Sequence, residues 1–244
     1  IKILRNLLKT HNLDGYIIPK NDEYFSEYAY PDRLKNISGF SGSAGFALVL
    51  NNTSYLFVDG RYITQAKIQS SKNFKILEIP NVYPHKILKK EKKLNIGYDP
   101  NLFTKFTLYN YFKKSVNLVN INKNFIDQIY LEKNPIKKNT FYNLKKKVTG
   151  ETAKSKIQRL SKILKENNID NLFISAPENV AWLLNLRGSD NPYSPIPNCK
   201  AIFSKKKIFL FTDLNKITKI KNLPFYKKIS FKKNNQFFLT LNSL

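Results

Sequence analysis

The sequence predicts an α/β protein built from two tandem domains of one fold, each a mixed sheet flanked by helices. The main observation is an internal repeat. A short apolar strand at residues 13–18, after a helical stretch, recurs at residues 169–174, an offset of 156. A strand ending in aspartate occurs at residues 55–59 and again at 208–213, where the aspartates are 154 apart. These offsets are too long for a solenoid unit, whose period is roughly 20–50 residues.

Each repeat is expected to open with an amphipathic helix. In the second repeat, the apolar residues between Thr152 and Asn167 are spaced by four, three and four positions, which is one face of an α-helix. The first repeat has a similar face near its start. These apolar positions are Ala153, Ile157, Leu160 and Leu164 in the second repeat, and Leu4, Leu7 and Leu8 in the first. A short buried strand is expected after each helix.

A β-hairpin is expected later in each repeat. The apolar runs at 46–50 and 55–58 are separated by four polar residues, which is a turn signal. The runs at 201–204 and 208–212 flank three lysines in the same way. A helix, a strand and then a hairpin is an order typical of an α/β layered domain with a mixed sheet.

The domain boundaries follow from the repeat. We expect the first domain over residues 1–125, a connection over 126–151, and the second domain over 152–244. The connection is polar, basic and weakly periodic, as is typical between domains. Only 31 residues follow Asp213, against about 70 after Asp59 in the first repeat. The second domain is therefore expected to be incomplete.

The composition limits the classes of function. The net charge of +25 would favour anionic partners, but 37 of the 42 basic residues are lysines spread along the chain. Together with abundant asparagine and isoleucine, this is typical of an AT-rich coding bias. We therefore interpret most lysines as solvated surface residues. No nucleic-acid-binding motif is present, so a specific nucleic-acid partner is not expected.

The sequence also indicates a cytoplasmic protein without a membrane partner. No apolar run approaches the roughly 18 residues that span a bilayer, and the start lacks the features of a signal peptide. The single cysteine, Cys199, excludes an internal disulfide framework and fits a reducing compartment. Methionine is absent even at position 1, which indicates that the chain is part of a larger gene product.

No complete catalytic or metal site is expected from the sequence. The two histidines, His11 and His85, lie outside any metal-binding motif, and Cys199 has no histidine nearby. The turn at 38–45 has the spacing GxxGxxG, which matches neither a Walker A loop nor a dinucleotide turn. Its expected role is close backbone packing before a strand. We therefore name no catalytic residue and no metal ligand.

Two motifs supply candidates for substrate access or for an interface. Arg61 follows a predicted strand end, and it could face a carboxylate or a neighbouring subunit, or bind Asp59 in its own domain. In the loop at 185–197, three prolines stiffen an extended backbone. Arg187 and Asp190 could form an ion pair that shapes this loop, or could face a substrate. In a chain whose basic residues are mostly lysine, the few arginines are conspicuous, because lysine cannot replace a guanidinium fork. The candidates are Arg61, Arg187, Asp190 and Tyr193.

At these motifs the chain resembles the Xaa-Pro aminopeptidases, also called aminopeptidase P. The matching segments are Ser26–Tyr28, Ser38–Gly45, Asp59–Tyr62 with Gln65 and Ala66, Ile126–Tyr130, and Trp182–Asp190 with Pro192 and Tyr193. They follow the order of the family. The resemblance implies the long, three-domain form of the enzyme. In that form, two creatinase N-terminal-like domains precede a catalytic domain that binds two divalent metals, usually manganese.

The resemblance implies a parent metallopeptidase, a homodimer, that removes an N-terminal residue preceding proline. Its partner is a peptide substrate with proline at the second position. The catalytic domain is absent from this chain, so no metal ligand is carried over and the 244 residues alone are expected to be inactive. Their expected role is to shape substrate access and to support dimerisation. The alternative is a non-catalytic peptide- or protein-binding module of the creatinase-like fold.

Overall fold

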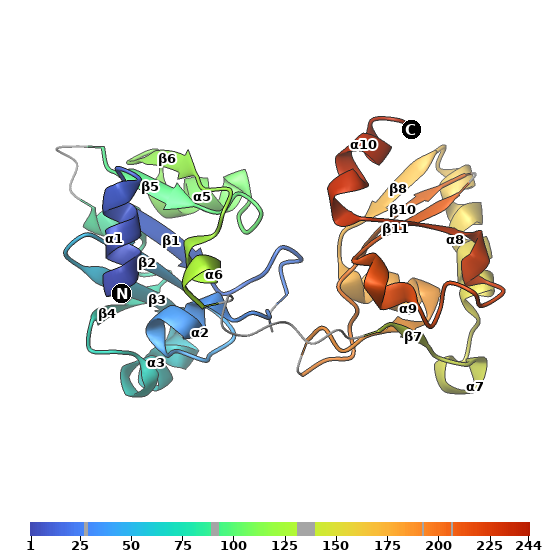
Figure 1. Cartoon of the computed structure of the whole chain (residues 1–244), viewed down its shortest axis with the longest axis horizontal. Helices are drawn as coiled ribbons and strands as arrows, with labels where there is room; N and C mark the ends of the chain where they lie inside the picture. Colours follow the sequence, from blue (N-terminus) through green and yellow to red (C-terminus); the bar gives the residue numbers. More distant parts are fainter. Residues whose placement is uncertain (27–28, 89–92, 131–139, 192, 206) are drawn as a thin grey trace. The chain divides into compact units, whose positions relative to one another are not determined.

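The chain forms two compact units, Ile1–Pro135 and Ile136–Leu244. The computed structural model describes residues 1–26, 29–88, 93–130, 140–191, 193–205 and 207–244. Glu27, Tyr28 and Pro192 of the sequence motifs lie outside the described residues. Each unit has its own sheet with helices packed against it (Figure 1). The predicted α/β class is therefore confirmed in both halves.

Unit 1 contains a six-stranded mixed sheet in the order β4-β3-β2-β1-β5-β6. Its strands are β1 (Gly15–Pro19), β2 (Phe46–Leu50), β3 (Ser54–Asp59), β4 (Phe74–Ile79), β5 (Asn95–Tyr98) and β6 (Asn117–Asn120). The central pairs β1–β2 and β2–β3 are antiparallel, as expected from the hairpin. The outer pairs β3–β4, β1–β5 and β5–β6 are parallel.

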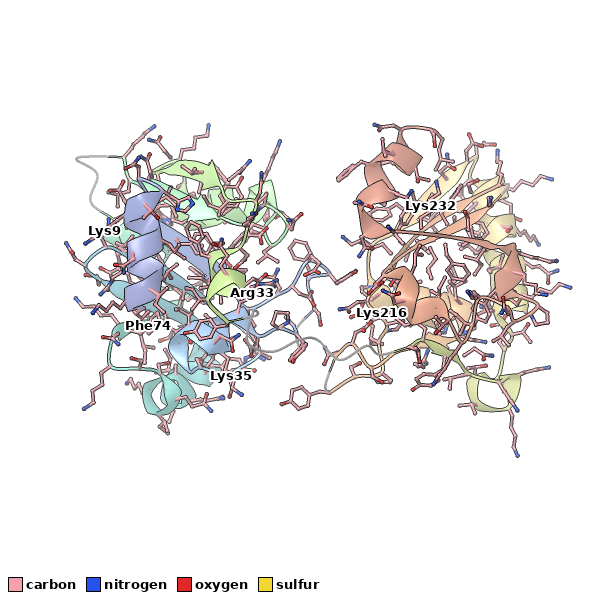
Figure 2. The ribbon with its side chains drawn as sticks, viewed as in Figure 1. Lys9, Arg33, Lys35, Phe74, Lys216 and Lys232 are labelled. Atoms are coloured by element: carbon pink, nitrogen blue, oxygen red, sulfur yellow. The ribbon has the colours of Figure 1, made fainter. Side chains whose placement is uncertain are left out.

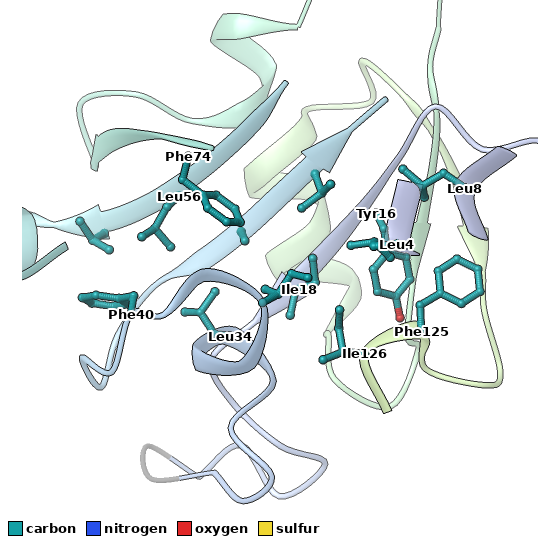
Figure 3. Close-up of a cluster of buried hydrophobic side chains, with 14 of the residues drawn as sticks. Leu4, Leu8, Tyr16, Ile18, Leu34, Phe40, Leu56, Phe74, Phe125 and Ile126 are labelled. Atoms are coloured by element: carbon teal, nitrogen blue, oxygen red, sulfur yellow. The ribbon is translucent and has the colours of Figure 1, made fainter. Parts of the chain in front are cut away.

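Both faces of this sheet are covered. The helices are α1 (Lys2–Thr10), α2 (Arg33–Ser38), α3 (Ile63–Gln69), α4 (Pro84–Ile87), α5 (Lys105–Phe112) and α6 (Phe125–Tyr130), with the 3₁₀ helix η1 (Gly60–Tyr62). Strand side chains alternate between faces. Tyr16 and Ile18 therefore join a core with α1, α2 and α6 (Figure 3), whereas Ile17 joins a second core with α5. All of β1 is buried as a result.

The glycine-rich turn before β2 packs closely, as the sequence indicates. Gly39 ends α2 with φ at 86°, and a Cβ atom there would lie 2.6 Å from the carbonyl oxygen of Gln69. Gly45 has φ at 147°, and a Cβ atom would lie 2.7 Å from the oxygen of Phe57. Both positions require glycine because the backbone is left-handed and another backbone atom is close.

Unit 2 contains a four-stranded sheet in the order β12-β11-β10-β8 and a small ribbon of β7 and β9. The strands are β7 (Tyr142–Asn143), β8 (Asn171–Ile174), β9 (Leu186–Arg187), β10 (Lys200–Ser204), β11 (Ile208–Phe211) and β12 (Ile229–Lys232). The helices are α7 (Lys146–Thr149), α8 (Ala153–Glu166), α9 (Pro177–Leu184) and α10 (Phe237–Leu241), with the 3₁₀ helices η3 (Leu214–Ile217), η4 (Tyr226–Lys228) and η5 (Asn234–Gln236). Thr152 begins α8 by accepting a hydrogen bond from the backbone N–H of Ser155.

The strand registers reproduce the repeat. Ile17 pairs with Leu48 across β1 and β2, and Phe173 pairs with Ile202 across β8 and β10, so the offsets are again 156 and 154. The third pairing, β3–β4 or β11–β12, is parallel in both units. The strand-end aspartates are also equivalent, because each starts a 3₁₀ helix by accepting a backbone N–H bond from the second residue beyond it.

The division between the units differs from the boundary expected at residue 125. Helix α6 contacts α1 and α2, and it buries Phe125 and Ile126 in the core of unit 1. Strand β7 and helix α7, also within the expected connection over 126–151, belong to unit 2. The expected connection is polar on average, so its composition does not reveal the apolar face of the six-residue helix α6. Residues 131–139 of that connection lie outside the described residues.

Candidate functional site

The loop that follows α9 is anchored at its base by Asn185. This residue ends α9 in the left-handed region, with φ at 53°. Its side-chain N–H group donates to the carbonyl oxygen of Glu151 at 2.9 Å, and its Oδ1 accepts from Lys156 Nζ at 2.8 Å. Lys156 also donates to the carbonyl oxygen of Trp182 at 2.7 Å, and its Nζ lies 4.3 Å from the Trp182 ring centroid. Burial lowers the pKa of the Lys156 ammonium.

Asp190 fixes the middle of the loop. Its Oδ1 accepts from Lys216 Nζ at 2.6 Å and its Oδ2 accepts from the backbone N–H of Asn198 at 2.7 Å. Only 3% of the Asp190 side chain is exposed. Lys216 comes from η3 in the same unit (Figure 2). At Gly188 a Cβ atom would lie 2.9 Å from the Cα of Pro197, so the two ends of the loop are in close contact. The loop is therefore braced on several sides.

Arg187 and Tyr193 are the candidate residues with exposed surface in this loop. Arg187 donates through Nη1 to the carbonyl oxygens of Leu186 at 2.7 Å and Ala181 at 3.3 Å. Its Nε and Nη2 atoms make no hydrogen bond within the described part of the chain. Tyr193 is 81% exposed. The loop thus presents an aromatic ring and one edge of a guanidinium on a rigid base.

The two roles considered for Arg187 and Asp190 are separated by the structure. Over the residues that the structure describes, the two side chains form no ion pair with each other. Asp190 binds Lys216, and Arg187 binds the carbonyl oxygens of Ala181 in α9 and Leu186 in β9. Asp190 therefore braces the loop, whereas Arg187 uses only Nη1 for hydrogen bonds among the described residues.

Arg61 lies on a different unit from the loop and binds its own domain. Its Nη2 and Nε atoms donate to the two carboxylate oxygens of Asp59 at 2.7 and 3.1 Å. This hydrogen bond lowers the pKa of Asp59. The Arg61 side chain is 75% exposed. The fork is used within its own domain.

Three residues that organise the structure were not singled out by the sequence. Lys156 and Lys216 are two of 37 lysines, and nothing local marks them as buried. Position 156 lies beside the apolar stripe of α8, which is the one available signal. The two carboxylate oxygens of Asp127 accept hydrogen bonds from Nε and Nη2 of Arg33, at 2.7 and 2.8 Å. The two residues are 94 positions apart in the sequence. Figure 2 shows Arg33 on α2.

The two histidines and the cysteine lie in separate local environments. His11 contacts the Phe125 ring, with centroids 4.8 Å apart, and His85 Nδ1 is 3.1 Å from the carbonyl oxygen of Tyr111. Cys199 is fully buried, and burial raises the pKa of its thiol. Within the described ranges, no three histidine, cysteine, aspartate or glutamate side chains gather in a way that could hold a metal ion.

The two units define a protein of two tandem α/β domains that share one strand pattern. Residues 1–129 and residues 132–244 each match the creatinase/prolidase N-terminal domain. The chain belongs to this family. Over the part of the chain that the structure describes, no helix combines the length and the apolar character needed to cross a bilayer.

Several relatives of this chain are named as aminopeptidases. The chain is 36% identical over 227 residues to a probable Xaa-Pro aminopeptidase P of Aspergillus fumigatus, covering 88% of this chain and 35% of that protein. It is 31% identical over 229 residues to aminopeptidase P1 of Lotus japonicus, covering 89% of this chain and 35% of the relative. The chain thus spans about a third of the length of these relatives.

A solved structure matches both units together. It is the X-prolyl aminopeptidase of Caenorhabditis elegans, described as a cytosolic enzyme with a di-nuclear active site. The match has a TM-score of 0.85 and 27% sequence identity, and it covers 99% of this chain and 43% of that enzyme. The resemblance to the N-terminal domains of the Xaa-Pro aminopeptidases is therefore confirmed.

Proposed function

We propose that this chain is the non-catalytic N-terminal region of a metal-dependent Xaa-Pro aminopeptidase, which removes an N-terminal residue preceding proline. The observation that carries the proposal is the structural match over 99% of this chain to less than half of the Caenorhabditis elegans enzyme. A match of that extent supports the proposal that the two units form one region of such an enzyme. The proposal includes a cytoplasmic location and assembly as a homodimer.

The metal chemistry of this enzyme class does not fit the residues described in this chain. The Caenorhabditis elegans enzyme has a di-nuclear active site, which needs a set of carboxylate or imidazole ligands. The described residues offer no such group. We therefore place the two divalent metals, proposed to be manganese, in a catalytic region outside the 244 residues, and no catalytic step is assigned to residues of this chain.

The proposed role of this region is to limit access to the active site. The loop at 185–197 supports this role because its base is braced by Asn185 and Asp190 while Tyr193 and one edge of Arg187 face outward. A rigid loop can exclude a folded protein and admit a free peptide N-terminus without paying the entropy of ordering. Arg187 has hydrogen-bond donors that suit a peptide carbonyl or carboxylate.

The first test separates the fragment from the longer enzyme. We expect the purified 244-residue chain to leave a peptide with proline at the second position uncut, with or without added manganese. We expect the longer protein from the same gene to release the first residue, to lose this activity with a chelator, and to regain it with manganese. Manganese-dependent cleavage by the 244-residue chain would refute the proposed division of roles.

A second test concerns Arg187. In the longer enzyme, Arg187→Lys is expected to lower peptide turnover about tenfold or more, because the charge stays but the planar fork is lost. The melting temperature of the 244-residue chain should fall by only about 2 °C, since the lysine can still reach one carbonyl oxygen. Asp190→Asn is the matched control. Compared with Arg187→Lys, it should have a larger effect on the melting temperature and a smaller effect on turnover per folded molecule. Unchanged turnover in Arg187→Lys would make the residue purely structural.

A further inference from the structure

Two hydrogen-bond donors are buried in unit 1 without an acceptor among the described residues. One is the hydroxyl of Tyr16 on β1, a residue that is 1% exposed. The other is Nη1 of Arg33 on α2, whose side chain is 9% exposed. Most buried polar groups in native proteins are hydrogen-bonded, to protein or to ordered water, because an unpaired one is costly. The two donors therefore point to a partner that is not a described residue.

Both donors lie next to the first turn of α6. The Tyr16 ring packs against Phe125, with ring centroids 4.9 Å apart (Figure 3). Arg33 donates from Nε and Nη2 to the two carboxylate oxygens of Asp127, so Nη1 is its one nitrogen without an acceptor among the described residues (Figure 2). Phe125 and Asp127 are two positions apart in the same helix. One short segment of α6 thus borders both donors.

The start of α6 is held by a buried carboxylate. Asp99, which follows β5, is 6% exposed, and its Oδ2 accepts from Nδ2 of Asn124 at 3.0 Å. Asn124 is 7% exposed, and its Oδ1 accepts from the backbone N–H of Ile126 at 2.9 Å. Each carboxylate oxygen can accept two hydrogen bonds. Asp99 Oδ2 and the carboxylate of Asp127 therefore bring spare acceptor capacity to this part of α6.

These donors and acceptors are close enough to influence one another. Burial raises the pKa of the Tyr16 hydroxyl, and the charges of Asp99, Asp127 and Arg33 also act on it. The backbone N–H of Phe125 approaches the hydroxyl as well, but an N–H group cannot accept the hydroxyl proton. Among the described residues the hydroxyl proton and Nη1 of Arg33 thus remain without an acceptor, although carboxylates are near.

The chemistry of these groups selects a neutral ligand that both accepts and donates hydrogen bonds. An anion would be attracted by Arg33 but repelled by the carboxylates of Asp99 and Asp127. A metal ion would be repelled by the guanidinium, and within the described ranges no three suitable ligands gather. Water is neutral and does both. Buried waters typically make about three hydrogen bonds to groups that would otherwise be unsatisfied.

We propose that unit 1 holds an internal water beneath the first turn of α6. The water accepts from the Tyr16 hydroxyl and from Nη1 of Arg33, and it donates to the carboxylates of Asp99 and Asp127. It thereby joins β1, α2 and the end of β5 to α6. Because Tyr16, Arg33 and Asp99 are all buried, this water exchanges with solvent only when α6 moves.

Replacing Tyr16 by phenylalanine separates a hydrated hydroxyl from an isolated one. If the hydroxyl binds water, Tyr16→Phe should lower the calorimetric melting temperature of the 244-residue chain by about 3 °C, because a buried hydrogen bond is lost. If the hydroxyl has no partner, its removal leaves the melting temperature unchanged or raises it, and the proposal is wrong.

Two other tyrosines calibrate this measurement. Tyr226→Phe should lower the melting temperature by a similar amount, because its buried hydroxyl donates directly to the carbonyl oxygen of Leu184 at 2.6 Å. Tyr30→Phe, at a position that is 46% exposed, should have no effect.

A crystal structure of the 244-residue chain tests the site directly, at a resolution that shows ordered water. We expect a water oxygen within about 3.2 Å of the Tyr16 hydroxyl and of Nη1 of Arg33. Crystals soaked in bromide should show no anomalous peak there, because the carboxylates exclude an anion. A bromide peak at the site would overturn the proposal. So would a protein acceptor that binds both donors directly.

Discussion

Replacing Asp190 by alanine is expected to destabilise unit 2 by about 3 kcal/mol or more, because a buried ion pair would lose one partner. Asp190 is the shared acceptor for Lys216 and for the backbone N–H of Asn198, and its side chain is only 3% exposed. Removing the carboxylate leaves the ammonium of Lys216, itself only 17% exposed, without that counter-ion. The free energy of unfolding is measured in urea by far-ultraviolet circular dichroism.

The control for this experiment is Asp170→Ala. Asp170 forms an ion pair with Lys205, but both side chains are more than half exposed, so its loss should cost less than about 0.5 kcal/mol. A second variant tests the mechanism. Adding Lys216→Met to Asp190→Ala should recover part of the lost stability, because the uncompensated charge is removed. If Asp190→Ala and Asp170→Ala cost the same, the proposed bracing of the loop is wrong.

The second large effect is expected in unit 1. Asp127→Ala should cost about 3 kcal/mol, because it removes both acceptors of the Arg33 fork. Arg33 is buried between α2 and α6, and its Nη1 atom already lacks a hydrogen-bond partner among the described residues. Arg33→Lys should also be destabilising, since one ammonium cannot replace two parallel N–H donors. Thermal unfolding by calorimetry measures both changes.

Asp59→Ala is the matched control for this pair. It removes an equally bidentate partner, but the Arg61 side chain is 75% exposed and is solvated after the change. Its expected cost is below about 1 kcal/mol. The two pairs share the bidentate geometry and differ in burial, and the cost of Asp59→Ala also includes the lost acceptor for the backbone N–H of Arg61. A cost for Asp127→Ala no greater than that for Asp59→Ala would show that the α2–α6 contact depends on its apolar residues alone.

Three strands of each repeat could be predicted, because each is a short apolar run and the hairpin runs are separated by polar turn residues. The outer strands β4, β5, β6 and β12 were not predicted. The offsets of 156 and 154 between the repeats reappear as equivalent pairs such as Ile17–Leu48 and Phe173–Ile202. Helix α6 could not be predicted as part of unit 1. Its contacts with α1 and α2 join segments that are far apart in the sequence, and its short apolar face is diluted by charged neighbours.

The candidate site was predictable only in part. Glycine and proline signals located the loop at 185–197, because these residues restrict the backbone locally. The partners of its charged residues were not predictable. Asp190 binds Lys216 rather than the nearby Arg187, and Lys156 is buried on an otherwise lysine-rich helix. Such pairings depend on which side chains the folded sheet brings together, and local sequence does not encode that.

The position of Trp182 has a consequence for unfolding experiments. It is the single tryptophan of the 244 residues, and it lies in unit 2 beneath the ammonium of Lys156. Its fluorescence therefore reports the denaturation of unit 2 alone, while the heat absorbed in calorimetry includes both units. A fluorescence transition that coincides with the calorimetric one means that the two units unfold cooperatively. If the two transitions are separate, a free energy of unfolding can be assigned to each unit from one sample.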